Sequence, residues 1–276
     1  MSAKTLFLRS SAAALTAVLV FSAAPSPVAA QDSAMRTIDL EMYLDLESVS
    51  NPQISPNGSE VVYTRGWVDK MNDRRESSVW IMNSDGSKNR FLVDGSGPIW
   101  SPDGARIAYT SSGDPEGTQI FVRWMDDEGA TSQVTRLESS PSGIRWSPDG
   151  EHLSFSMNVD AEPAFMVTPP GRPDGAEWVE SPRVVTRADY RQDRVGFVDG
   201  AWRHIFVVPA EGGTARQLTD GDWNHSTGEW TPDGAELLFS SLRTADAELA
   251  WRQSEVYSAN VMSGAIRQLT TRNGQD

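Results

Sequence analysis

The stretch Trp100-Ser101-Pro102-Asp103-Gly104 decides the fold, because the same five-residue pattern recurs along the chain. The other copies are Ile54-Ser55-Pro56-Asn57-Gly58, Trp146-Ser147-Pro148-Asp149-Gly150 and Trp230-Thr231-Pro232-Asp233-Gly234. Their first residues are 46, 46 and 84 positions apart. A repeat of about 40 to 50 residues with short strands is typical of the blades of a β-propeller. The sequence therefore predicts an all-β fold of the propeller class.

Each copy of this turn motif also has a local explanation. An apolar residue ends one strand, and the following Pro sets φ for a tight turn. The Asp or Asn side chain can bond to nearby backbone, and the Gly accepts the left-handed conformation that closes the turn. Short strand-like runs rich in apolar residues follow each motif, in residues 61–63, 106–109, 152–155 and 236–239. This pattern predicts a β-hairpin at every copy.

A second, weaker repeat completes the units. Strand-like segments run into acidic glycine turns at Ser84-Asp85-Gly86, Asp127-Glu128-Gly129 and Glu211-Gly212-Gly213. The last of these turns is followed by Arg216-Gln217-Leu218-Thr219, and the same strand recurs at Arg267-Gln268-Leu269-Thr270. We therefore expect about four blades of four antiparallel strands within residues 54–276. The spacing of 84 allows two blades with one motif lost or one blade with an insertion, and the Pro-rich and charged composition of about 169–200 favours the insertion.

Residues 1–30 have the pattern of a secretory signal peptide. Lys4 and Arg9 precede an apolar run at 12–24, and small residues then lead to a predicted cleavage between Ala30 and Gln31. The run is too short to cross a bilayer, so we expect an exported protein, periplasmic or extracellular. Residues 31–53 form a lead-in segment, in which the spacing of Leu40, Tyr43 and Leu44 predicts a short helix.

Composition excludes several classes of function. The net charge of −14 disfavours nucleic acid and anionic membrane surfaces as partners, because carboxylates repel both. The chain has no cysteine, which excludes thiolate zinc sites, disulfides and a thiol nucleophile. The sequence suggests no cofactor.

A family resemblance appears in the lead-in and in the third unit. It is carried by the run Val49-Ser50-Asn51-Pro52-Gln53-Ile54-Ser55-Pro56, by the segments Val185-Thr186-Arg187 and Arg203-His204-Ile205-Phe206-Val207-Val208, and by Tyr190 and Gly196. Together with the turn motifs, they resemble the amino-terminal propeller of exported serine peptidases of the prolyl oligopeptidase family, of the acylaminoacyl-peptidase or dipeptidyl-peptidase kind. The resemblance covers residues 36–272. The turn motif alone also resembles the periplasmic propeller of the Tol system.

The resemblance implies a division of labour. Such peptidases hold their serine nucleophile in a Gly-x-Ser-x-Gly elbow of a carboxy-terminal α/β-hydrolase domain. No such elbow occurs in these 276 residues, so we expect no catalytic residue here and a peptide substrate that is met through the absent hydrolase domain. The propeller would then admit only short peptides to the active site. The alternative is a Tol-type protein-interaction module without catalysis.

The same resemblance implies an incomplete ring, because these peptidases use more than four blades. Unclosed blades would expose apolar faces and strand edges, so we expect self-association.

Few side chains qualify as candidate site residues. Arg187, Tyr190 and Arg191 in the insertion could face a substrate, although a solvated loop explains them as well. His152, His204 and His225 are isolated in the sequence and are more typical of packed or hydrogen-bonded histidines than of ligands or bases. The run Asp126-Asp127-Glu128 lacks the spaced oxygens of a calcium loop. We therefore predict no metal site.

Overall fold

The computed structural model describes residues 38–126, 128–161, 170–179, 185, 187–188, 190–198, 200–245, 247, 249 and 253–271. The predicted signal peptide, with Ala30 and Gln31 at its cleavage site, lies outside these residues. Of the first 39 residues, which form a unit separate from the rest, only Ile38 and Asp39 are described. The second unit begins at Leu40 with the five-residue helix α1 (Leu40–Leu44). No helix in the described ranges is long and apolar enough to span a membrane.

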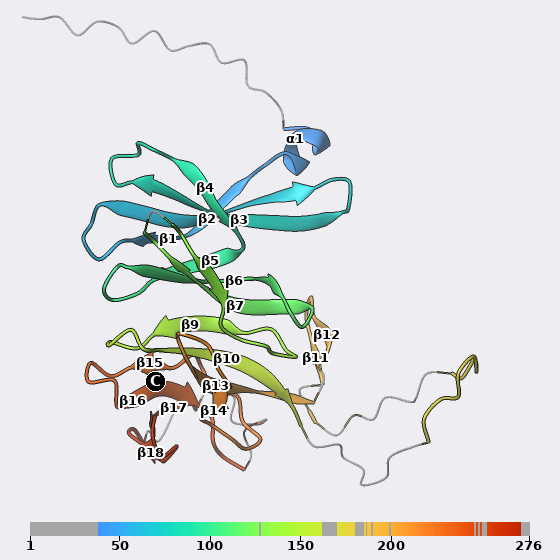
Figure 1. Ribbon diagram of the computed structural model, residues 1–276. Helices are drawn as coiled ribbons and strands as arrows, with labels where there is room; N and C mark the ends of the chain where they lie inside the picture. Colours follow the sequence, from blue (N-terminus) through green and yellow to red (C-terminus); the bar gives the residue numbers. More distant parts are fainter. Residues whose placement is uncertain are drawn as a thin grey trace, which may run out of the picture. The chain divides into compact units, whose positions relative to one another are not determined.

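Among its described residues, the second unit contains four antiparallel sheets of four strands (Figure 1). Sheet 1 contains β1 (Ser48–Ile54), β2 (Glu60–Asp69), β3 (Arg74–Asn83) and β4 (Arg90–Asp94), and sheet 2 contains β5 (Ser96–Trp100), β6 (Arg106–Gly113), β7 (Gly117–Trp124) and β8 (Thr131–Gln133). Sheet 3 contains β9 (Ser142–Trp146), β10 (His152–Asp160), β13 (Ala201–Pro209) and β14 (Arg216–Gln217), and sheet 4 contains β15 (Glu229–Trp230), β16 (Glu236–Ser241), β17 (Glu255–Asn260) and β18 (Ile266–Gln268). The structure confirms the predicted propeller class, with four blades of four strands.

Two boundaries are now defined by strand pairing. β1 pairs with β2, so the first blade begins at Ser48, inside the segment that we expected to precede the blades. β10 pairs with β13 over its whole length, from His152 opposite Pro209 to Asp160 opposite Ala201. The 84-residue spacing therefore covers one sheet, and the additional chain between Asp160 and Ala201 includes the short hairpin of β11 (Arg191–Gln192) and β12 (Gly196–Phe197).

The four turn motifs share one hydrogen-bond pattern. In the second copy, Ser101 Oγ donates to Asp103 Oδ1 at 2.5 Å and accepts the Arg106 backbone N–H at 2.9 Å. Asp103 Oδ1 also accepts the Ala105 N–H at 3.0 Å, and Gly104, with φ of 72°, donates to the Ser101 carbonyl. The residue before each Ser or Thr ends a strand, as the sequence predicts. The turn therefore satisfies its own polar groups through side chains that the motif specifies.

Successive turns lie against one another. A Cβ atom built on Gly104 would lie 3.3 Å from Pro56 Cδ, in the turn one sheet earlier. A Cβ atom built on Gly150 would lie 3.7 Å from Pro102 Cδ, and one built on Gly234 would lie 3.7 Å from Pro148 Cδ. Each glycine thus leaves room for the proline ring of the preceding turn, and we call this series of contacts the turn ladder.

Apolar side chains fill the spaces between consecutive sheets. The first cluster joins Val62 and Ile81 of sheet 1 to Tyr109 of sheet 2, and every one of these side chains is buried. Two further clusters join sheet 2 to sheet 3 and sheet 3 to sheet 4; their central members are Ile120, Val122, Leu153, Phe155, Ile205, Val207, Leu237 and Phe239. Among the described residues these clusters link the sheets in chain order. The core is therefore divided into layers, each shared by two neighbouring sheets.

Candidate functional site

Polar and aromatic side chains gather between sheets 3 and 4, where the long connection of sheet 3 ends and that of sheet 4 begins. β13 starts here with Ala201-Trp202-Arg203, after the insertion of the third blade. The linker from β14 to β15 passes beside it, because the His225 N–H donates to the Arg203 carbonyl at 3.0 Å and Arg203 Nε donates to the His225 carbonyl at 3.1 Å. This reciprocal pair fixes the linker against the start of β13. We call the cluster formed by His204, Thr219, Trp223, His225, Arg243 and Tyr257 the linker cluster.

Two histidines form the buried part of the linker cluster. The rings of His204 and His225 lie with centroids 5.2 Å apart, and both residues are buried. His225 Nδ1 contacts the Arg203 carbonyl at 3.0 Å, and Arg243 Nη1 contacts His225 Nε2 at 3.0 Å. A carbonyl only accepts and a guanidinium only donates, so Nδ1 carries the proton and Nε2 accepts. His225 is therefore a neutral imidazole with both nitrogens engaged.

The repeat also assigns the tautomer of His204. In sheet 2 the Thr135 hydroxyl accepts the Ile120 N–H at 2.9 Å and donates to Gln119 Oε1 at 3.0 Å. In sheet 3 the Thr219 hydroxyl accepts the Ile205 N–H at 3.0 Å and lies 3.3 Å from His204 Nδ1. Because His204 occupies the place of the accepting Gln119, we assign the Thr219 hydroxyl as donor to Nδ1, with the His204 proton on Nε2.

Burial dominates the titration of both histidines. The pKa of His225 is lowered to about 4, against an ordinary value of 6.5; desolvation is the largest cause, and the positive charge of Arg243 contributes to the lowering. Desolvation also lowers the pKa of His204, while the carboxylate of Asp220 opposes this shift. Both imidazoles are therefore uncharged near neutral pH. Neither ring is placed to act as a general base, because His225 has no free nitrogen and both rings are buried.

Arg243, in the connection that follows β16, contacts the aromatic residues of the linker cluster. Its guanidinium carbon lies 4.7 Å from the centroid of the Trp223 ring and 5.9 Å from that of Tyr257. Trp223 Nε1 in turn donates to the Thr244 carbonyl at 3.3 Å. The linker between the blades and the long connection of sheet 4 are thus held together through one arginine and its aromatic neighbours.

The three candidate residues of the insertion lie on two different aromatic rings. The guanidinium carbon of Arg187 lies 3.8 Å from the ring centroid of Trp202, next to Arg203. Tyr190 and Arg191 instead contact Phe197 in the β11–β12 hairpin, with separations of 6.3 Å and 5.8 Å from its ring centroid. The contacts described above do not unite these three residues into one site, and their contact with a substrate stays a prediction.

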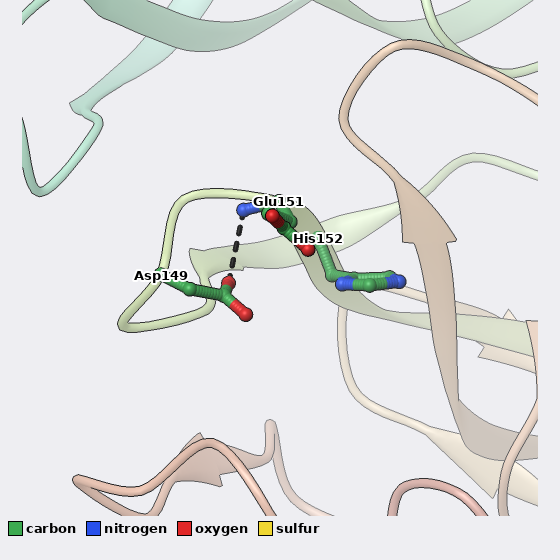
Figure 2. A group of neighbouring side chains, drawn as sticks. All are labelled: Asp149, Glu151 and His152. Carbon is green, nitrogen blue, oxygen red and sulfur yellow. Dashed lines mark hydrogen bonds between the residues drawn. The ribbon is translucent and has the colours of Figure 1, made fainter.

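A second group of side chains has metal-ligand chemistry. Ligand atoms of Asp149, Glu151 and His152 lie within 4.8 Å of one another, around the third turn motif (Figure 2). However, Asp149 Oδ1 already accepts the Ser147 hydroxyl at 2.5 Å and the Glu151 N–H at 2.9 Å. Asp103 and Asp233 make the same bonds in turns that lack the neighbouring histidine. The turn therefore accounts for this aspartate without a metal. The acidic turn at 126–128 includes residue 127, which lies outside the described residues.

Comparison with known proteins supplies the family context. No family model matches the chain. The chain is 27% identical to a protein called uncharacterized peptidase YuxL from Bacillus subtilis over 221 residues, 76% of this chain and 32% of that protein. It is 33% identical to dipeptidyl-peptidase 5 from Porphyromonas endodontalis over 107 residues, 37% of this chain and 15% of the relative. The chain thus spans a third or less of the length of these relatives.

A solved structure agrees in fold. An acylaminoacyl peptidase in complex with Z-Gly-Gly-Phe-chloromethyl ketone superposes on 85% of this chain and 34% of its own, with a TM-score of 0.64 and 18% identity. The chain is a peptidase-related β-propeller. This peptidase-related propeller has the fold and relatives that its turn motifs and third-unit segments predict.

Sequence reasoning did not find the linker cluster or one of the repeats. Ser132-Gln133-Val134-Thr135 in sheet 2 is a third copy of the Arg-Gln-Leu-Thr strand, since Gln133 Nε2 donates to the Thr135 carbonyl as Gln217 Nε2 does to that of Thr219. Two of its four residues differ, which hid it. The repeat sets the register of the two strands that brings His204 to Thr219, and this register is the signal that could have revealed His204.

Proposed function

We propose that this chain is the propeller part of an exported serine peptidase that acts on short peptides, and that the propeller limits access to the active site. The similarity over 221 residues to a Bacillus protein named as a peptidase carries this proposal. The solved acylaminoacyl peptidase supports the fold of that part. The chain contains no Gly-x-Ser-x-Gly elbow, so the proposal assigns it no bond-breaking residue.

The insertion of the third blade is the element through which we expect access to be limited. It leaves β10 at Asp160 and returns to β13 at Ala201, beside the linker cluster. Its described part presents Tyr190 and Arg191 at an exposed hairpin. A loop supported by a paired strand at each end can cover an opening without disturbing the sheet.

A serine-directed fluorophosphonate probe tests the assignment of chemistry. We expect the chain of 276 residues to stay unlabelled, and the product of the reading frame extended beyond codon 276 to carry one labelled serine in a Gly-x-Ser-x-Gly sequence. An extended frame without this sequence, whose product the probe does not label, would contradict the proposal. A Tol-type binding module would then be the remaining candidate.

Peptide length tests the gating role. In the extended protein, residues 170–198 are replaced by a short Gly-Ser linker, and kcat/KM is measured for substrates of two to twelve residues. We expect the values for longer substrates to rise toward those for short ones, while the values for dipeptide and tripeptide substrates change little. An unchanged dependence of kcat/KM on substrate length would show that the insertion does not limit access to the active site.

Export is tested by amino-terminal analysis. Material recovered from the periplasm or medium is expected to begin at Gln31, because the small residues before it suit signal peptidase. Uncleaved chain retained in the membrane would contradict export in this form.

A further inference from the structure

We propose that Arg243 in the linker cluster binds the carboxylate of a short peptide. This inference rests on the proposed function, because it names the part of a peptide substrate that the propeller recognises. Arg243 lies two residues after Ser241, the last residue of β16 in sheet 4, and its Nη1 donates to Nε2 of the neutral His225 at 3.0 Å.

The charge of Arg243 has no counter-ion within the described part of the chain. Arg106 pairs with Glu211 at 3.0 Å and Arg145 with Glu229 at 2.9 Å, whereas the partners of Arg243 among the described residues are an imidazole and two aromatic rings. A guanidinium has five N–H donors, and among the described residues only Nη1 meets an acceptor. Trp223 and Tyr257 lie beside the guanidinium carbon, and neither ring accepts along the guanidinium edge, so the donors of Nε and Nη2 are left for a ligand.

The position of Arg243 is fixed before any ligand arrives. Trp223 and Tyr257 flank the guanidinium, and His225 holds one nitrogen through a ring that is itself anchored to the Arg203 carbonyl. Fixing the side chain in advance reduces the entropy lost on binding. Arg is also the side chain whose planar fork matches a carboxylate with two parallel bonds.

The surroundings select a small, singly charged ligand. Asp220 and Asp222 are close enough to raise the pKa of His204 by their negative charge, and the chain as a whole carries a net charge of −14. These charges repel polyanions such as nucleic acid. A single carboxylate meets the guanidinium at far lower electrostatic cost, and the aromatic rings provide apolar surface for the rest of a peptide.

The insertion ends at the same place. Arg203, which anchors His225, follows Trp202, and the ring of Trp202 carries the guanidinium of Arg187 at 3.8 Å. A peptide held by Arg243 would therefore meet the end of the insertion, which is the element proposed to limit access.

Titration of the chain with peptides, followed by the indole N–H signals in ¹H–¹⁵N NMR, tests the inference. The probes are acetyl-Ala-Ala-Ala with a free carboxylate, its amide, and acetyl-Ala-Asp-Ala-amide. The Trp223 signal is assigned through Trp223→Phe. We expect the free acid to shift this signal with an affinity at least about tenfold above that of the amide, as for loss of a charge-assisted bond. The aspartyl amide shows whether a side-chain carboxylate serves as well as the peptide terminus.

Variants locate the effect. Arg243→Gln is expected to bring the affinity for the acid down to that for the amide, and Arg243→Lys to keep part of the difference. The control is Arg136→Gln, which removes an exposed arginine from the linker between sheets 2 and 3, away from the linker cluster, and should leave binding unchanged. If Arg243→Gln does not fold, the acid and amide comparison on the unaltered chain still decides.

Equal affinities for acid and amide, or full binding by folded Arg243→Gln, would overturn the inference and leave Arg243 a structural residue. Binding is measured on the 276-residue chain, to which the proposal assigns no catalytic serine. A failure of this chain to bind therefore counts against the carboxylate site alone. An extended protein that the fluorophosphonate probe leaves unlabelled would instead overturn the proposed function.

Discussion

The indole N–H of Trp146 donates to the backbone carbonyl of Ile99, 47 residues earlier, at 3.2 Å. Trp100 makes the same bond to the carbonyl of Gln53 at 3.1 Å, so this tryptophan of the turn motif ties each sheet to the one before it. The fourth copy departs from the pattern, because Trp230 Nε1 is buried and has no hydrogen-bond partner.

This difference predicts unequal costs for one substitution. Trp146→Phe removes a bond between sheets and is expected to lower the free energy of unfolding by about 1 to 3 kcal/mol more than Trp230→Phe, which removes an unsatisfied donor. Urea unfolding of both variants followed by circular dichroism measures the difference. Equal losses would show that the indole bond adds nothing to the packing of the ring.

The turn aspartates predict an acid-sensitive stability. The Ser101 hydroxyl lowers the pKa of Asp103, and the Ser147 hydroxyl lowers that of Asp149. A carboxylate with a lowered folded pKa stabilises the fold above the unfolded value of about 4, and this contribution is lost as the pH falls through the folded pKa. Stability should therefore decline below about pH 4.

The first turn motif provides the matched variant. Asn57 accepts the Ser55 hydroxyl at 2.8 Å and the Ser59 N–H at 2.9 Å without a charge. The double variant Asp103→Asn and Asp149→Asn should therefore fold normally and show a smaller loss of stability between pH 4 and pH 3. Urea midpoints at pH 7, 4 and 3 measure this loss of stability. An unchanged loss between pH 4 and pH 3 would show that other carboxylates cause it.

Glycine substitutions separate backbone strain from crowding. Gly58 and Gly143 have similar positive φ values of 75° and 62°. A Cβ on Gly58 would have nothing within 4 Å, whereas one on Gly143 would lie 2.3 Å from Thr227 Oγ1. Gly58→Ala should cost about 1 to 2 kcal/mol for the left-handed backbone. We expect Gly143→Ala to cost clearly more, and similar thermal midpoints for the two variants would contradict this packing.

His225 predicts a second pH effect at higher pH. Its folded pKa of about 4 lies below the ordinary 6.5, so the unfolded chain binds more protons between these values. Stability contributed by the neutral, buried ring is therefore present above about pH 6.5 and is lost as the pH falls toward 4. His225→Gln should flatten this part of the stability profile, which urea midpoints between pH 7 and pH 4 measure. An unchanged profile would contradict the role of His225.

Self-association stays a prediction, and sheet 1 offers a way to test it. Val49 and Ile54 on β1 are each 68% exposed, although their strand belongs to a sheet whose other strands contribute to the core. Replacing both by Lys should reduce association of the chain, measured by size-exclusion chromatography with light scattering. Met71→Lys, at a 91% exposed position in the hairpin of the same sheet, is the control. An unaltered chain that elutes as a monomer would contradict the prediction.

The parts of the fold that the sequence predicts are those with local causes. Pro, Asp and Gly define each turn within five residues, and a short run rich in apolar residues defines the strand that follows, so β2, β6, β10 and β16 could be placed in advance. The contact of His204 with His225 could not, because these residues are 21 positions apart and meet only through the path of the linker. That Arg243 has no ion pair among the described residues depends on burial and on where the acidic side chains lie, which no local pattern contains.

The turn ladder makes the propeller a chain of pairwise couplings. Sheets 2 and 3 each contact a neighbour on both sides through Pro–Gly pairs, whereas in the described structure Gly58 of sheet 1 has nothing where the other glycines meet a proline. In such a one-dimensional array, opening an inner sheet breaks two couplings and opening an outer one breaks one. Amide hydrogens should thus exchange with deuterium in a graded order, slowest around Ala108 and Phe155, so that the linear order of the repeats becomes an order of local unfolding.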